Sequence, residues 1–449
     1  DKLVMTCYHI TILTTLEEYL MTEFIVYDAL CGSGKTTKVK NYILDNPNER
    51  FIYISPFLKE SYKLAGIEYE ELDDDVVPKI SNLTGLLEYD ETNPVSKLRF
   101  KYPDRKKGRG SKETSLSHLM SSGFNITSTH QLFTHMSINS LEGAEQFTLI
   151  IDEALSVYEE SNAIGKTEVK KLLEIGILYL DCDGITLRFD RDKFGINSDY
   201  KGDKVEGTAY EPLATMCDLS QLLLIDGKTI VWEMSADMLR KFKKVIICTY
   251  LFEGQLFSSY LKKHGIEYEI NKFGKQPQEV KHLFDVVDDS HLNMIGADDY
   301  ALSKSYFEKP STRQGARDVC RKHLNTVMRK WGAKTDNRLF TCFKTDKSFI
   351  GDKRYTKNWL PFNCRATNEF KDVEHVAYLV NVFPSPILIK AAHGKDTEFN
   401  DDIHALGELL QFLYRGCLRE NKPMKIYLPS SRMRKLLFKW LDGEFTKNG

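Results

Sequence analysis

A glycine-rich segment near the start of the chain has the residue types that bind nucleotide phosphates. It follows the apolar run 24–27, precedes a helix-like segment, and reads Ala29-Leu30-Cys31-Gly32-Ser33-Gly34-Lys35-Thr36. The two glycines would let backbone N–H groups curl around a β-phosphate, and the N-terminus of the following helix would add its positive dipole end. Lys35 would reach the β- and γ-phosphates, and the Thr36 hydroxyl would ligate Mg²⁺. We therefore predict that ATP binds the segment Cys31-Gly32-Ser33-Gly34-Lys35-Thr36-Thr37, although Ala29 stands where a first glycine is usual.

Two adjacent carboxylates end another apolar run. Residues 147–151 form this run, and Asp152 and Glu153 follow it directly. In parallel α/β ATPases the carboxyl ends of the strands meet at the ligand crevice, so the pair would face the glycine-rich segment. Asp152 would hold the water shell of Mg²⁺, and Glu153 would orient and deprotonate the attacking water. Such a pair alone is usually the acidic start of a helix, but its place after a phosphate-binding segment favours the catalytic interpretation.

A third group of polar residues lies far along the chain. Apolar residues recur at helical spacing through 402–418, which predicts an amphipathic helix. Gln411, Arg415 and Arg419 are spaced four apart, so we expect them on one face of this helix. Two guanidinium groups and an amide suit the binding of phosphate from outside the first domain. The alternative is a solvated basic helix face, and the position of the group in the order of motifs favours the phosphate-binding interpretation.

The elements that must position these groups alternate between strands and helices. Apolar runs at 51–55, 125–129, 147–151 and 244–250 predict a doubly wound parallel sheet, and the alternation restarts beyond residue 265 with candidates at 338–344, 377–382 and 424–428. We therefore expect two α/β domains, at 21–264 and 265–449. We also expect insertions at about 66–120 and 158–243, a basic helical insertion at about 300–335, and an N-terminal extension at 1–20 that could be non-native.

Composition excludes several classes of protein. The chain has 449 residues, 42% of them hydrophobic, and no run approaches the roughly 18 apolar residues of a membrane helix. Its nine cysteines are scattered and never form a Cys-x-x-Cys pair, which argues for reduced thiols and against a structural zinc site. We expect a soluble protein of the cytoplasm, or of the host cytoplasm if a phage encodes it, with no membrane partner.

The net charge of −2 hides a local excess of positive charge. Between residues 304 and 357 there are fifteen Lys or Arg against five Asp or Glu, interleaved with aromatic residues. Such a surface would attract a phosphate backbone, and Arg317, Arg321 and Lys322 would then contact phosphates. The alternative, which we favour for most of the aromatic rings, is a basic helix whose rings belong to the core.

Together these segments resemble the nucleic-acid-dependent ATPases of helicase superfamily 2, over roughly residues 22 to 430. The resemblance implies two tandem RecA-like parallel-sheet domains of the α/β class with inserted segments, and with ATP and Mg²⁺ bound between the domains. It implies that Thr249 couples the two domains and that Gln411, Arg415 and Arg419 complete the catalytic site. It further implies a set of residues that contact nucleic acid: Pro56, Lys59, Thr129, His130, Lys344, Arg365, Thr367 and Asn368.

Two departures from the family pattern matter, one for the catalytic arginine and one for the expected substrate. Arg415 and Arg419 are four apart where the family usually has three, so either could be the arginine that reaches the γ-phosphate. No glutamine precedes Gln131, so the adenine-reading glutamine of many RNA helicases is absent, and Leu155 replaces a polar residue of their Asp-Glu motif. These differences favour DNA, as a single strand or fork, and the pattern is similar to compact phage-encoded helicases of DNA replication or recombination. An ATP-driven switch or clamp on duplex DNA, an RNA helicase and an ATPase acting on protein remain alternatives.

Overall fold

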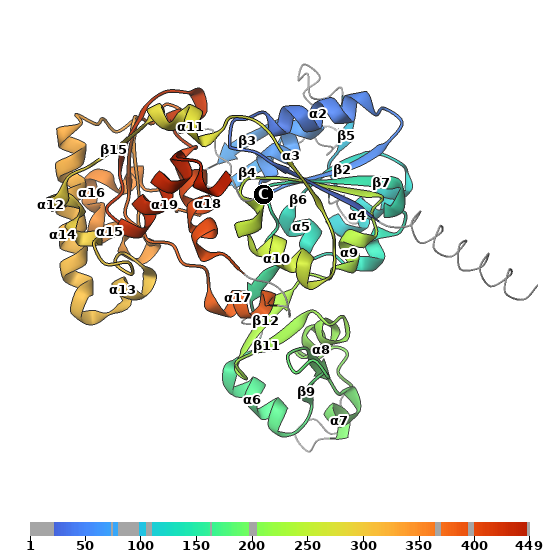
Figure 1. Cartoon of the computed structure of the whole chain (residues 1–449). Coiled ribbons are helices and arrows are strands. Elements are labelled where there is room, and N and C mark those ends of the chain that lie inside the picture. Colours follow the sequence, from blue (N-terminus) through green and yellow to red (C-terminus); the bar gives the residue numbers. More distant parts are fainter. Residues whose placement is uncertain are drawn as a thin grey trace, which may run out of the picture.

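The protein consists of two parallel sheets, each flanked by helices, with a smaller lobe attached to the first (Figure 1). The computed structural model describes residues 22–72, 75–79, 98–104, 110–161, 164–196, 204–363, 370–393 and 399–446. No helix in these ranges is long and apolar enough to cross a membrane. The prediction of two tandem RecA-like α/β domains with inserted segments is confirmed.

The first sheet has seven strands, and all of its neighbouring strands are parallel. Its central strands are apolar and buried on both faces, as is typical of a sheet covered by helices on both sides. The strand order is β14 (Glu269–Lys272), β1 (Glu23–Asp28), β13 (Lys244–Thr249), β7 (Phe147–Asp152), β2 (Arg50–Ser55), β6 (Asn125–Thr129) and β5 (Phe100–Lys101). The helices are α2 (Lys35–Asp45), α3 (Leu58–Ala65), α4 (Lys112–Ser121), α5 (His130–Thr134), α9 (Asp237–Arg240) and α10 (Leu256–Lys263).

Two expected boundaries in the first domain need correction. β14 pairs with β1, so the first sheet continues to Lys272, beyond the boundary expected after residue 264. The expected insertion at 66–120 contains part of the domain itself, because β5 pairs with β6 and α4 buries Leu116 and Met120 in the core. A hairpin of β3 (Tyr69–Leu72) and β4 (Asp75–Pro78) also lies in this range.

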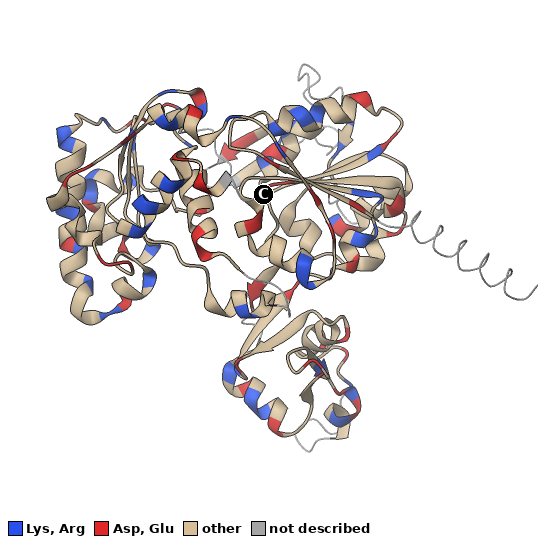
Figure 2. Cartoon of the chain, viewed as in Figure 1, with Lys and Arg blue, Asp and Glu red and all other residues tan. Residues whose placement is uncertain are grey.

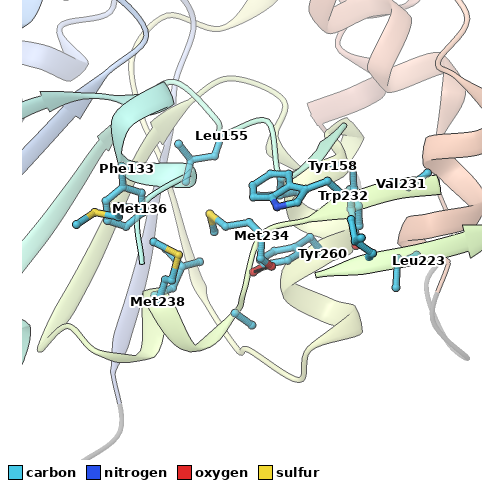
Figure 3. Close-up of a cluster of buried hydrophobic side chains, with 14 of the residues drawn as sticks. Phe133, Met136, Leu155, Tyr158, Leu223, Val231, Trp232, Met234, Met238 and Tyr260 are labelled. Carbon is cyan, nitrogen blue, oxygen red and sulfur yellow. Dashed lines mark hydrogen bonds between the residues drawn. The ribbon is translucent and has the colours of Figure 1, made fainter. Parts of the chain in front are cut away.

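The chain between β7 and β13 builds the lobe that extends below the two sheets in Figure 1. Its three-stranded antiparallel sheet shares a core with the first domain, because Trp232 and Met234 belong to the same buried cluster as Phe133 and Leu155 (Figure 3). The lobe therefore packs on the first domain through apolar contacts. Its elements are β8 (Tyr158–Glu160), α6 (Lys166–Glu174), β9 (Leu178–Leu180), β10 (Leu187–Phe189), α7 (Arg191–Ile196), α8 (Glu211–Asp218), β11 (Leu222–Ile225) and β12 (Thr229–Glu233).

The second sheet has four parallel strands. Their order is β15 (Phe284–Val286), β18 (Met424–Tyr427), β17 (His375–Tyr378) and β16 (Arg338–Thr341). Helices α11 (Pro277–Val280), α12 (Ser290–Asn293), α13 (Lys304–Glu308), α14 (Pro310–Lys330), α15 (Lys347–Ile350), α16 (Asp352–Tyr355), α17 (Pro386–Ala392), α18 (Asp401–Leu413) and α19 (Ser431–Leu441) accompany them.

Helix α14 lies in the range where we expected a basic helical insertion, and it packs as a structural layer of the second domain. Its apolar face, which includes Cys320 and Leu324, shares a core cluster with Phe340 of β16. Arg317 is only 7% exposed, and its Nε donates a 2.7 Å hydrogen bond to Asp346 Oδ1, so it is not available to a phosphate backbone. The remaining Lys and Arg residues recur along the outer side of the helix (Figure 2).

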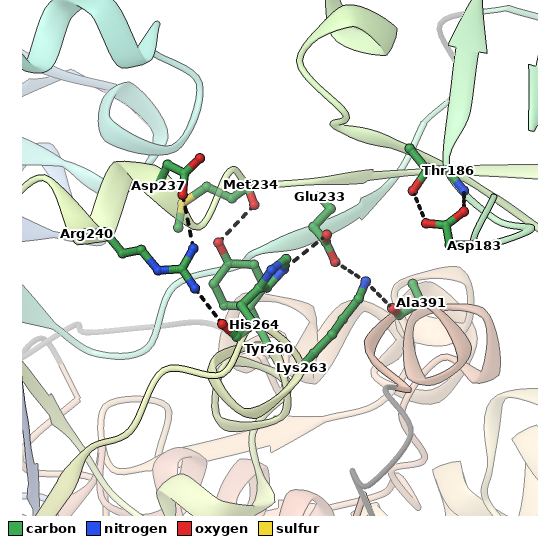
Figure 4. A network of polar contacts seen from close by, with 10 residues as sticks. All are labelled: Asp183, Thr186, Glu233, Met234, Asp237, Arg240, Tyr260, Lys263, His264 and Ala391. Carbon is green, nitrogen blue, oxygen red and sulfur yellow. Dashed lines mark hydrogen bonds and ion pairs between the residues drawn. The ribbon is translucent and has the colours of Figure 1, made fainter. Parts of the chain in front are cut away.

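A helix of the second domain also reaches the junction between the first domain and the lobe. Ala391 of α17 is fully buried in the core cluster of the first domain. Beside it, Glu233 of the lobe forms an ion pair with Lys263 of α10 at 2.5 Å, and Lys263 donates a further hydrogen bond of 2.9 Å to the Ala391 carbonyl (Figure 4). Lys390 of α17 pairs with Asp226 of the lobe at 2.8 Å. The junction thus joins three parts of the molecule.

Candidate active site between the two domains

The glycine-rich segment forms a tight loop between β1 and α2. Gly32 and Gly34 have φ angles of +81° and +83°, a left-handed conformation that side chains rarely adopt. Gly34 caps α2, and the helix begins at Lys35. The Lys35 ammonium donates to the carbonyl of Ala29 and, at 3.4 Å, to that of Leu30. The lysine is therefore held over the loop, where a phosphate group would replace these carbonyls as its partner.

Four neighbouring strands bring acidic and hydroxyl groups beside the loop. Asp152 of β7 lies opposite Cys248 of β13, and Thr249 lies opposite Asp28 of β1. The Tyr53 hydroxyl, from β2, donates a 2.8 Å hydrogen bond to Asp152 Oδ2. Burial raises the pKa of Asp152 to about 6, and the negative charge of Glu153 adds to the rise. A buried carboxylate is stabilised in its negatively charged form by a nearby cation, so Asp152 is suited to binding one.

Glu153 has a conformation that is uncommon outside glycine. Its φ is +65°, and its backbone N–H donates a 2.8 Å hydrogen bond to the Cys248 carbonyl, which holds the turn. Within the described residues, its Oε2 atom is buried and has no hydrogen-bond partner. The turn thus fixes a carboxylate oxygen that a water molecule could satisfy.

The second domain contributes Gln411, Arg415 and Arg419, but not from one helix face as expected. Helix α18 ends at Leu413, so Arg415 follows it and Arg419 lies in the 3-10 helix Cys417–Glu420. The turn passes through Gly416, where a Cβ would lie 2.8 Å from the Val373 carbonyl oxygen and 2.4 Å from a methionine side chain. The four-residue spacing of the arginines is therefore not a helical repeat, because close packing requires the chain to turn at this glycine.

These groups from both domains nevertheless line one cavity of about 380 Å³. Arg419 crosses the phosphate-binding loop so closely that a Cβ on Gly32 would lie 3.5 Å from its Cγ. The lining residues are Cys31, Gly32, Gly34, Lys35, Thr36, Thr37, Glu60, Asp152, Glu153, Thr249, Tyr250, Gln411, Tyr414, Arg415, Arg419 and Glu420. Of the residues expected to bind ATP, only Ser33 is not among them; it packs against Gly274.

Polar atoms without partners are concentrated at this cavity. Among the described residues, Glu60 Oε2, Glu153 Oε2, Tyr414 Oη and Arg415 Nε are buried and make no hydrogen bond. The first domain thus presents two carboxyl oxygens, and the second domain presents two donors. Because buried polar groups are nearly always paired in folded proteins, this arrangement favours a polar occupant. Acceptors suit the waters of a hydrated cation or an attacking water, and donors suit phosphate oxygens.

Sequence reasoning missed Glu60 and Tyr414. Glu60 follows Lys59, and burial raises its pKa to about 8, with the charges of Asp152 and Glu153 adding to the rise. The only sequence signal for Glu60 was its place just after β2, since strand ends meet at the crevice. Tyr414 continues the apolar stripe of α18 and therefore reads as a core residue.

The residues expected to contact nucleic acid lie in several different environments. Pro56 and His130 line a groove of about 880 Å³ between the domains. Thr129 caps α5 by accepting a 3.3 Å hydrogen bond from a backbone N–H, and Lys59 pairs with Glu71 at 2.5 Å. Lys344 is exposed beyond the end of β16. The expectations for Arg365, Thr367 and Asn368 fall outside the described residues.

The part of the groove that the described residues form lacks the cations that a phosphate backbone would attract. None of the described residues that line it is a lysine or an arginine. They include two carboxylates and a set of aromatic and histidine rings: Phe57, His130, His135, Phe362, Phe383 and His404. The described lining of this groove therefore offers no lysine or arginine to a phosphate backbone.

Three cavities with shared lining residues, together called the cleft, lie along α18 from the nucleotide cavity to the groove. A smaller cavity of about 140 Å³ shares Glu153 and Gln411 with the first, and shares His404 and Glu408 with the groove. Thr249 lies beside this path, where its hydroxyl accepts a 2.8 Å hydrogen bond from a glutamine of the following loop. Residues of one helix thus face both ends of the cleft.

Comparisons with known sequences place this chain near a prophage protein. Residues 278–441 match the model of the YonV C-terminal Rossmann-like domain. Over 442 residues the chain is 29% identical to the SPbeta prophage-derived uncharacterized protein YonV of Bacillus subtilis (strain 168). The matched region covers 93% of this chain and 98% of that protein.

Comparisons with solved structures concern the fold. A structure described as "XPD_Helicase" matches with a TM-score of 0.51 and 12% identity, covering 95% of both chains. The structure of S. tokodaii Xpd4 matches with a TM-score of 0.50 and 12% identity, covering 93% of this chain and 94% of that one. The chain therefore has the fold of XPD-type helicases, with its lobe included in the covered length.

Proposed function

We propose that this protein is an ATP-dependent DNA helicase or translocase, which couples ATP hydrolysis to movement along a nucleic-acid strand. The observation that carries the proposal is the composition of one cavity. Lys35, Asp152 and Glu153 line it from the first domain, and Arg415 and Arg419 line it from the second. Such a site is complete only when the domains are closed, so hydrolysis would be linked to a change in their arrangement.

Each residue type has a distinct role in this proposal. The Thr36 hydroxyl and the Asp152 carboxylate are hard oxygen ligands that suit Mg²⁺, which would neutralise charge on the phosphates. Glu153 would accept a proton from the attacking water as that water bonds to the γ-phosphorus and ADP leaves. Lys35 and the two arginines would stabilise the charge that develops on the phosphoryl oxygens.

The proposed track for nucleic acid is the groove that contains Pro56 and His130. Its connection to the nucleotide cavity through the cleft along α18 gives the two sites a shared wall, and Thr249 lies beside that wall. The fold of XPD-type helicases supports nucleic acid as the partner. The prophage origin of the YonV protein supports a role in phage DNA replication or recombination.

The test is an ATPase assay with single-stranded DNA, duplex DNA and single-stranded RNA, combined with release of a labelled strand from a forked substrate. We expect single-stranded DNA to stimulate turnover most and the labelled strand to be released. Equal stimulation by duplex DNA without strand release would instead support a duplex-bound switch, and preference for RNA would support an RNA helicase. Turnover that no nucleic acid stimulates would contradict the proposal.

A further inference from the structure

Tyr414 is a buried phenol at the point where the second domain meets the phosphate-binding loop. It is the residue after the end of α18, is 4% exposed, and lines the nucleotide cavity. Its ring belongs to the same buried cluster as Leu30 of the loop, and Cys31 packs against that cluster. On the other side it packs against Phe284, with ring centroids 6.2 Å apart. The ring is therefore fixed in position by both domains.

The hydroxyl at the end of this ring has no hydrogen-bond partner among the described residues. A buried hydroxyl without a partner is unfavourable, and here it belongs to a residue that lines a cavity in which a ligand could satisfy it. Tyr250, which lines the same cavity, differs because its hydroxyl already accepts a 2.7 Å hydrogen bond from Trp440. Burial raises the pKa of Tyr414, with Cys31 and Tyr250 adding to the rise, so its hydroxyl remains a donor at neutral pH.

We propose that the Tyr414 hydroxyl donates a hydrogen bond to the terminal phosphate of ATP bound in this cavity, an inference that rests on the proposed function. Tyr414 lies beside Arg415 and against Cys31, and Arg419 crosses the loop at Gly32. The second domain therefore approaches the phosphate end of the site. The neighbouring donor, Arg415 Nε, is likewise buried without a partner.

This contact would let the protein distinguish ATP from ADP. A hydrogen bond to the terminal phosphate is lost when that phosphate leaves, whereas contacts of the loop to the other phosphates persist. Tyr414 would thus favour the closed arrangement of the domains only while ATP is intact, because its ring belongs to the second domain and its ligand is held by the first.

The experiment compares full-length wild-type protein with Tyr414→Phe, which keeps the ring and removes only the hydroxyl. Binding of ADP and of a non-hydrolysable ATP analogue is measured by titration calorimetry with Mg²⁺ present. We expect Tyr414→Phe to weaken binding of the analogue about tenfold or more and to leave ADP binding unchanged, as for loss of a hydrogen bond to a charged group.

Tyr378→Phe is the matched control. Its hydroxyl is also buried without a partner among the described residues, but its ring packs on Phe412 inside the second domain and does not line the cavity. We expect this variant to bind both nucleotides as the wild type does. A similar loss of analogue affinity in Tyr378→Phe would show an indirect effect of core hydroxyls and would overturn the assignment.

Two further outcomes would overturn the inference while leaving the proposed function intact. One is unchanged analogue binding by Tyr414→Phe, and the other is an equal loss for ADP and the analogue, which would exclude the terminal phosphate. The proposed function fails separately: wild-type protein would bind neither nucleotide, or Lys35→Ala would bind both as well as the wild type does.

Discussion

The indole N–H of Trp440 donates a 2.7 Å hydrogen bond to the hydroxyl of Tyr250, and this bond crosses between the two domains. Trp440 is fully buried in α19, while Tyr250 directly follows β13, next to Thr249. The two rings meet edge to face, with centroids 6.5 Å apart. A directional contact therefore fixes the second domain to the strand end that borders the nucleotide cavity.

We predict that Tyr250→Phe lowers the free energy of unfolding by about 1–3 kcal/mol, because it leaves the buried indole N–H without an acceptor. Urea unfolding followed by tryptophan fluorescence measures this change. Tyr300→Phe is the control, since Tyr300 is 69% exposed and its loss of a hydroxyl should have little effect. Equal stability of the two variants would show that the Trp440 bond contributes nothing.

We predict that Lys35→Ala and Glu153→Gln separate phosphate binding from hydrolysis. Lys35→Ala should abolish turnover without unfolding the protein, because the lysine neutralises phosphate charge and packs no core. Glu153→Gln should bind ATP and lose hydrolysis, because the amide keeps the shape but cannot accept the proton. Steady-state ATPase, nucleotide binding and circular dichroism measure these effects. A Glu153→Gln variant that cannot bind ATP would reverse the roles given to Asp152 and Glu153.

We predict that Arg415→Ala and Arg419→Ala each reduce turnover about a hundredfold or more, with the smaller change in ATP affinity for the arginine that acts on the transition state. Steady-state kinetics separates kcat from KM for each variant. Arg329→Ala, which removes an exposed arginine of α14, is the matched control and should leave turnover unchanged. Normal turnover in both test variants would remove the second domain from the site.

We predict that Glu60 makes the nucleotide-free protein less stable as pH rises. Its pKa is about 8 in the folded protein, against an ordinary value of 4.5, so between these values the folded state holds a proton that the unfolded chain releases. The free energy of unfolding must then fall as pH increases through this window. Glu60→Gln should flatten the dependence and be more stable than the wild type near pH 8. Urea unfolding at several pH values between about 4.5 and 8 measures how the free energy of unfolding depends on pH.

The exposed Glu145→Gln variant is the control for this titration and should retain the wild-type pH dependence. If Glu60→Gln also retained it, the buried carboxyl would not be the group that takes up the proton.

We predict that the outer face of α14 contributes to DNA binding only through its exposed cations. Changing Lys322, Arg329 and Lys330 to glutamate should weaken binding and reduce its salt dependence, while basal ATPase persists. Fluorescence anisotropy with a labelled single strand at two salt concentrations measures both quantities. An unchanged affinity and salt slope would identify this face as solvated surface.

Arg317→Glu tests the same helix in another way. It would place a carboxylate beside Asp346, to which Arg317 now donates a hydrogen bond within a buried ion pair, so it should destabilise the domain by about 3–5 kcal/mol.

The parts of the site that could be predicted are local in sequence. The loop at Gly32 and Gly34 and the pair Asp152-Glu153 each follow a strand, and parallel strands end at a common edge, so their proximity follows from strand order alone. The turn at Gly416 could not be predicted, because it depends on contacts with β18 and with the segment before β17. Helical periodicity therefore extended α18 too far.

Residues whose role depends on burial could not be predicted from the sequence either. Charge counting assigned Arg317 to a surface, but its pairing with Asp346 is set by how α14 packs on the second sheet. The position of Glu60 after β2 was too weak a signal, because its environment arises only when α3 packs beside the end of β7 and the second domain covers the cavity. Composition and periodicity describe single elements, whereas these properties belong to the contacts between elements.

The docking of α17 bears on how the chain reaches its native state during synthesis. Ala391 and Ala392 fill a core cluster whose other fully buried members all come before residue 267. The first domain therefore lacks part of its interior until more than a hundred later residues have been made. A fragment that stops after β14 would therefore expose the apolar surface that α17 covers.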